Sequence, residues 1–205
     1  IESIDGEEIK AGMDYFPLLD GKVGKNVRLG IRNAKGKKME VTVKAISQGK
    51  LNNLLYKRWV DRNRAFVDSI SGGRIAYVHV KAMDSESFRT VYSELLSDKN
   101  RNRDAVIVDE RHNGGGWLHD DLCTLLNGKQ YQEFVPHGKV VGRDPFNKWV
   151  KPSCVMICEN DYSNGHGFPW VYKELGIGKL IGAPVAGTMT AVWWERLMDN
   201  TLVFG

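Results

Sequence analysis

The 205-residue sequence contains only three cysteines, and none of its apolar runs is long enough to cross a bilayer. Three cysteines cannot all pair within one chain, so a full disulfide framework is excluded. The chain begins with Ile1 and shows no charged segment ahead of an apolar one, so we expect a fragment or a processed product. The expected compartment is the cytoplasm, or the periplasm if the parent protein carries a signal peptide.

Excess charge is also small, because 29 Lys and Arg against 25 Asp and Glu leave a net charge of +4. The basic run "NAKGKK" at 33–38 has no interleaved aromatic residues and is typical of a hairpin tip, so no nucleic-acid partner is expected. Cys154 and Cys158 lie roughly 13 Å apart on an extended strand, too far to share one metal ion. The His-Asp-Asp run at 119–121 is more typical of a solvated helix face. We therefore expect no metal and no cofactor.

Hydrophobic patterning divides the chain into a β-rich unit over 1–46, a helical connector over 47–73 and an α/β unit over 74–205. In the first unit, "NVRLGIRN" and "KMEVTVKAI" alternate apolar with polar residues and predict a two-stranded ribbon. From Arg74 onward, apolar strand-like segments alternate with helical ones. This order predicts a parallel sheet with right-handed crossovers. The expected strands are "IAYVHV", "DAVIVDE", "SCVMICEN" and "KLIGAPV".

Two unusual turns follow expected strands of this sheet, "NGGG" at 113–116 and "DYSNGHG" at 161–167. Such turns meet at the carboxyl edge of an α/β sheet, where ligands bind. Successive glycines let backbone N–H groups approach a developing negative charge, and a serine between strand and helix exposes its hydroxyl. From these residues alone, Ser163 as an ordinary N-cap and "NGGG" as a flexible turn stay open.

The segments "DAVIVDERHNGGGW" and "ENDYSNGHGFPWVYKELGIGKLIGAPVAGTMTAVWWE" resemble the S41 serine peptidases, in particular their tricorn protease branch. The resemblance implies an α/β core of the ClpP/crotonase-like type. The order of elements in 1–46 resembles the later part of a PDZ domain. Ser163 corresponds to the nucleophile of that family. Asn164, where the branch often has aspartate, and Gly115, with Gly114 beside it, correspond to the oxyanion hole.

The resemblance also implies that the general base is absent from these residues. In the tricorn branch the histidine precedes the PDZ-like unit, and the glutamate follows the "TLVFG" region. A Ser/Lys dyad, which related carboxyl-terminal processing peptidases use, also has no candidate here, because no lysine follows Lys179 in this sequence. His166 is three residues from Ser163, but a side chain from the same first turn has poor geometry for a base. His112 and His166 are instead expected to contact substrate.

The leading hypothesis is a serine endopeptidase that acts on peptides or unfolded segments through an acyl-enzyme on Ser163. A non-catalytic ligand- or peptide-binding domain on the same fold is the alternative. An acyl-CoA enzyme of the crotonase type is a third hypothesis, with less need of an exposed serine. A homo-oligomer of the parent protein stays open. Trp117, Trp170, Trp193 and Trp194 are expected in the core rather than in a peptide cleft.

Overall fold

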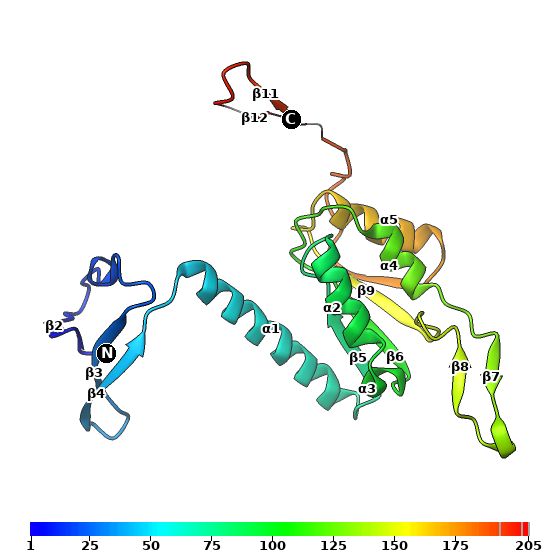
Figure 1. The fold of residues 1–205 in the computed structure, drawn as a ribbon, viewed down its shortest axis with the longest axis horizontal. Coiled ribbons are helices and arrows are strands. Elements are labelled where there is room, and N and C mark those ends of the chain that lie inside the picture. Colours follow the sequence, from blue (N-terminus) through cyan, green and yellow to red (C-terminus); the bar gives the residue numbers. More distant parts are fainter. Residues whose placement is uncertain (193, 202, 205) are drawn as a thin grey trace. The chain divides into compact units, whose positions relative to one another are not determined.

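The computed structural model describes residues 1–192, 194–201 and 203–204. It consists of two compact units, Ile1–Trp59 and Val60–Gly205, which are described separately here. Figure 1 gives the element labels used below. The expected boundaries at 46 and 73 differ from this division because one helix, α1 (Gln48–Ile70), occupies most of the expected connector.

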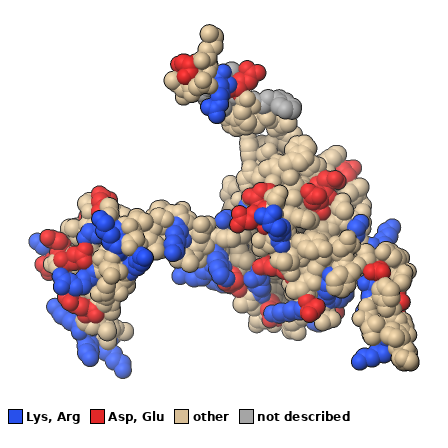
Figure 2. Space-filling view, viewed as in Figure 1, with Lys and Arg blue, Asp and Glu red and all other residues tan. Residues whose placement is uncertain are grey.

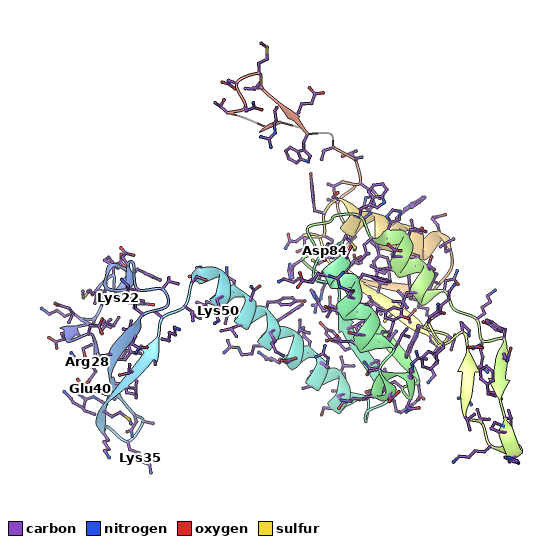
Figure 3. All side chains as sticks on the ribbon, viewed as in Figure 1. Lys22, Arg28, Lys35, Glu40, Lys50 and Asp84 are labelled. Atoms are coloured by element: carbon purple, nitrogen blue, oxygen red, sulfur yellow. The ribbon has the colours of Figure 1, made fainter. Side chains whose placement is uncertain are left out.

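The first unit is built around the predicted ribbon of β3 (Asn26–Arg32) and β4 (Lys38–Lys44), which pair antiparallel. β1 (Ser3–Ile4) adds to the free edge of β3 and pairs with β2 (Glu7–Glu8), while η1 (Phe16–Leu19) is a short 3-10 helix. Asp5 is a local anchor, because its carboxylate accepts the Arg28 N–H at 2.7 Å and pairs with Lys22, both labelled in Figure 3.

The second unit contains the predicted parallel sheet, with strand order β10-β9-β6-β5. These strands are β5 (Ile75–His79), β6 (Ala105–Asp109), β9 (Ser153–Ile157) and β10 (Lys179–Gly182). Strands that neighbour each other in the sheet also follow each other in this set along the chain, and because each pair is parallel, a crossover must connect its two strands. The α/β fold expected from the sequence is confirmed.

The crossovers are α2 (Ser85–Leu95), the short α3 (Asp98–Arg101), α4 (His119–Leu126) and α5 (Asn164–Glu174). Asp84, labelled in Figure 3, caps α2, since its side chain accepts the Ser87 N–H at 2.7 Å. Val78, Val108 and Val155 on one face of the sheet join Leu95, Leu122, Phe168 and Tyr172 of the helices in one buried core. These helices therefore pack against one face of the sheet, and the turns lie at its carboxyl edge.

Further elements were not predicted. β7 (Gln132–Phe134) and β8 (Gly142–Asp144) form a two-stranded ribbon around η2 (Pro136–Gly138), drawn in Figure 1 beside the sheet. β11 (Glu195–Arg196) pairs with β12 (Val203–Phe204) near the end of the chain. These strands are two or three residues long, too short for an alternating pattern to mark them.

The expectation of core tryptophans is wrong for three of the four residues. Trp117, Trp170 and Trp194 are 72%, 56% and 70% exposed, and Trp193 lies outside the described residues. The core tryptophan is Trp149, whose indole N–H reaches the Pro152 carbonyl at 3.2 Å. Around the α/β unit, basic and acidic side chains are interspersed on the face shown in Figure 2. Among the described helices, none combines the length and apolar character needed to cross a membrane.

Candidate active site

Ser163 lies between β9 and α5 with a strained backbone. It is the N-cap residue of α5 with φ 53° and ψ −117°, yet its side chain makes no capping hydrogen bond. A residue other than glycine rarely adopts a positive φ, and this backbone conformation costs about 1–3 kcal/mol. This conformation turns the chain sharply from strand to helix, and among the described residues the Ser163 hydroxyl has no hydrogen-bond partner, so the interpretation of Ser163 as an ordinary N-cap is not supported.

The glycine turn after β6 is in contact with the serine turn. Gly115 has φ 93°, and a β-carbon added to it would lie 2.7 Å from Ser163 Cβ and 2.8 Å from the Tyr162 carbonyl oxygen. Only glycine fits this position, because both the backbone angle and the space exclude a side chain. The structure thus brings together Gly115, Ser163 and Asn164, three of the four residues that the resemblance selected.

Asn113, which is fully buried, holds the two turns in place. Its N–H donates to the Glu110 carbonyl and to Asp161 Oδ1, its carbonyl accepts the Tyr162 N–H at 2.9 Å, and its Nδ2 donates to the Val80 carbonyl. Asp161 is itself tied to the end of β9, because its Oδ2 accepts the Cys158 N–H at 2.8 Å. Each of these hydrogen bonds therefore ties one turn either to the other turn or to the end of a strand.

The backbone donors near Ser163 are not equivalent. The Gly115 N–H donates to Asn113 Oδ1 at 2.8 Å, so it is already engaged. Within the described residues, the N–H groups of Gly114, Gly116 and Asn164 have no hydrogen-bond partner. Asn164 is the first residue of α5, where such N–H groups are free to bind an anion.

The histidines expected near the site use their ring nitrogens elsewhere. His166 Nδ1 accepts the Met189 N–H at 3.2 Å, and exposed His112 lies with its Nδ1 3.5 Å from Asn160 Nδ2. His119 Nδ1 accepts from Asn164 Nδ2 at 2.8 Å. In the described part of the chain, Ser163 Oγ makes no hydrogen bond to a histidine.

Three buried carboxyl groups surround the turns. Burial would raise the pKa of Asp109, but hydrogen bonds from Arg111 and Tyr77 outweigh it and lower that pKa below its ordinary value. Glu110 is fully buried, its two carboxyl oxygens have no hydrogen-bond partner among the described residues, and burial together with the charge of Asp161 raises its pKa well above the ordinary value. Burial also raises the pKa of Asp161. Of the three carboxyl groups, that of Glu110 alone accepts no hydrogen bond within the described residues, so nothing there offsets the effect of burial on its pKa.

A segment after β10 crosses the start of α5. Thr188 Oγ1 accepts the Ser163 N–H at 3.4 Å, and Met189 packs against Gly167. Neither contact was predicted. The sequence holds one signal for Asn113, since Asn before glycine is typical of a turn in which the side chain bonds its own backbone. It holds none for the bonds of Thr188 to Ser163 and of Asp161 to Asn113, whose partners are 25 and 48 positions apart in the chain.

A cavity of about 420 Å³ in the second unit lies elsewhere, between α3 and residues 140–151, with Arg101 and Phe146 among its lining residues. It contains none of the candidate site residues. The hydrogen-bonded turns at the carboxyl edge are the better candidate, because they combine strain, close backbone approach and free donors.

A strained serine between a parallel strand and a helix, faced by a glycine turn, is the arrangement of an α/β serine hydrolase site. The sequence profile of peptidase family S41 matches residues 74–204. Because the match covers more than half of the sequence, the chain belongs to peptidase family S41.

Similarity to tricorn proteases extends over nearly the whole chain, as the sequence predicted. The tricorn protease of Thermoplasma acidophilum is 29% identical over 206 residues, which cover 99% of this chain and 19% of that protein. A tricorn protease homolog of Saccharolobus solfataricus is 28% identical over 207 residues, covering 99% of this chain and 18% of that protein. A crystal structure of the tricorn protease has a TM-score of 0.83 at 27% identity, covering 98% of this chain and 19% of that one. The chain therefore spans about a fifth of the length of these relatives.

Proposed function

We propose that the parent protein is a serine endopeptidase that cleaves peptides through an acyl-enzyme on Ser163. The observation that carries the proposal is the strained Ser163 in contact with Gly115 at the carboxyl edge of the sheet. Backbone strain at a single half-buried serine is characteristic of functional sites, where surrounding contacts enforce it. Membership of peptidase family S41 supports the same chemistry.

In the proposed reaction, Ser163 Oγ attacks the scissile carbonyl and the Asn164 N–H stabilises the resulting oxyanion, together with an N–H of the glycine turn. Gly115, the expected second donor, would first have to leave Asn113 Oδ1, whereas the Gly116 N–H is unengaged among the described residues. Gly115 then supplies the close approach and Gly116 the hydrogen bond. Gly114 remains their neighbour in the turn.

The general base is proposed to come from residues outside this sequence. The Nδ1 atom of His166, the histidine nearest to Ser163 in sequence, already accepts a backbone N–H. Contacts of His112 and His166 with substrate remain part of the proposal, as do the PDZ-like nature of 1–46 and a peptide as substrate.

The test is active-site labelling of the parent protein with a fluorophosphonate, followed by peptide mapping and by assays of peptide turnover. We expect the label on Ser163, and neither labelling nor turnover in Ser163→Ala. Turnover that survives in Ser163→Ala would refute the proposal. A parent protein that binds peptides but is neither labelled nor active would instead support the non-catalytic binding domain.

A further inference from the structure

Helix α4 begins without a capping residue of its own. Leu118 occupies the N-cap position and has no side-chain acceptor to offer. The N–H groups of Leu118 and His119 instead donate to Asn164 Oδ1 at 2.8 and 3.0 Å. A residue 45 positions further along the chain therefore caps this helix. That residue directly follows Ser163.

The same hydrogen bonds fix the orientation of the Asn164 amide. Both partners of the atom facing α4 are N–H donors, so that atom is the oxygen. The remaining atom, Nδ2, lies 2.8 Å from His119 Nδ1 and donates to it. His119 consequently carries its proton on Nε2. An aspartate at 164 has no N–H with which to make this bond.

Asn164 is only 2% exposed, so these three groups have little access to water as a substitute partner. Its main-chain N–H is one proposed oxyanion donor. Its side chain bonds the N–H groups of Leu118 and His119, which follow shortly after the glycine turn that supplies the other donor. The two donors are thus joined through one residue.

We propose that Asn164 is a positioning residue, whose side chain ties the start of α4 to the start of α5 and so fixes the distance between the two oxyanion donors. His119 completes the link by accepting from Nδ2. The inference rests on the proposed peptidase function. An asparagine makes the bond to His119 while His119 Nδ1 is an acceptor, whereas an aspartate would need the proton of His119 on Nδ1.

The decisive measurement is the kinetics of peptide hydrolysis by the parent protein, expressed per active site titrated with a fluorophosphonate. Asn164→Leu removes all three bonds, and we expect kcat to fall about 10- to 100-fold, because small misplacements of catalytic groups carry such costs. KM should change less than about twofold, since ground-state binding does not depend on the oxyanion donors.

Two further variants test the link if Asn164→Leu folds poorly. Asn164→Asp keeps the oxygen that accepts both N–H groups, and His119 can turn its proton to Nδ1, so kcat should stay within about fivefold of the parent. His119→Leu removes only the Nδ1 acceptor, and we expect an intermediate loss of about 3- to 10-fold in kcat.

Ser153→Ala is the matched control. Ser153 lies on β9, and its Oγ forms a hydrogen bond of 2.7 Å with the hydroxyl of Tyr172. Tyr172 belongs to α5, as Asn164 does, but lies near the other end of that helix. A merely structural role of Asn164 would make its variants behave like this control, with lower thermal stability and unchanged kcat per titrated site.

The outcomes separate the two proposals. Unchanged kcat per site in both Asn164→Leu and His119→Leu, with an active parent, would overturn the positioning role and leave the peptidase intact. A parent that is neither labelled nor active would overturn both.

Discussion

Gly115 and Ser163 are in such close contact that a β-carbon on the glycine would lie 2.7 Å from Ser163 Cβ. The contact joins residues from two different crossovers of the parallel sheet. This contact distinguishes Gly115 from Gly114, because a β-carbon on Gly114 would meet nothing within 4 Å. Neighbouring glycines of one turn therefore have different physical requirements.

Gly115→Ala should destabilise the protein by about 2 kcal/mol or more, since it adds both an unfavourable positive φ and a clash with the serine turn. Peptide turnover should fall with it. Gly114→Ala should alter stability by no more than about 0.5 kcal/mol, because its side chain would enter open space. Thermal melts of both variants check this, and equal destabilisation would contradict the assigned contact.

The strain at Ser163 predicts that two inactive variants differ in stability. Ser163→Ala retains a β-carbon at φ 53° and should change stability by no more than about 0.5 kcal/mol. Ser163→Gly relieves the strained angle and should be more stable than Ser163→Ala by about 1 kcal/mol. The control is Ser93→Gly in the exposed part of α2, where glycine should instead cost about 1 kcal/mol. Denaturant unfolding at neutral pH measures all three.

Glu110 should make the stability of the protein depend on pH. Its pKa in the folded state is raised above the ordinary 4.5, so the folded protein holds this proton more tightly than the unfolded chain. The free energy of unfolding should therefore fall as pH rises from 4.5 toward the raised pKa, and be unaffected by this group at lower pH.

Glu110→Leu should remove this dependence and raise stability by about 1–3 kcal/mol near neutral pH, because it replaces a buried, unpaired carboxyl group with an apolar side chain. Unfolding at several pH values checks the prediction, with exposed Glu174→Leu as the control. A gain that is the same at pH 4 and pH 8 would show that the carboxyl group is not the cause.

The sequence predicted the parts of this structure that depend on local pattern. Apolar runs of β5, β6, β9 and β10 and the glycine and serine turns were found because each is marked by neighbouring residues. Contacts between turns were not predictable in this way. Thr188 and Asp161 bond partners in other segments, and Asn164 bonds His119, 45 positions earlier in the chain. The core assignment of Trp117 failed because residue type alone does not tell which side of a turn faces water.

The last prediction concerns the 205-residue chain by itself. It should be inactive toward peptides even with Ser163 intact, whereas the full-length parent should hydrolyse them. A serine hydroxyl becomes reactive when a base accepts its proton, and among the described residues no histidine bonds Ser163 Oγ. An oxyanion hole alone leaves an acceleration of roughly 10³ to 10⁴ over water, too small for an ordinary peptidase assay. Turnover by parent and isolated chain at matched concentration is the measurement, with thermal melts to show that the isolated chain is folded. Parent-like turnover by a folded isolated chain would mean that the base lies within these residues, and His166, released from Met189, would then be the first histidine to replace.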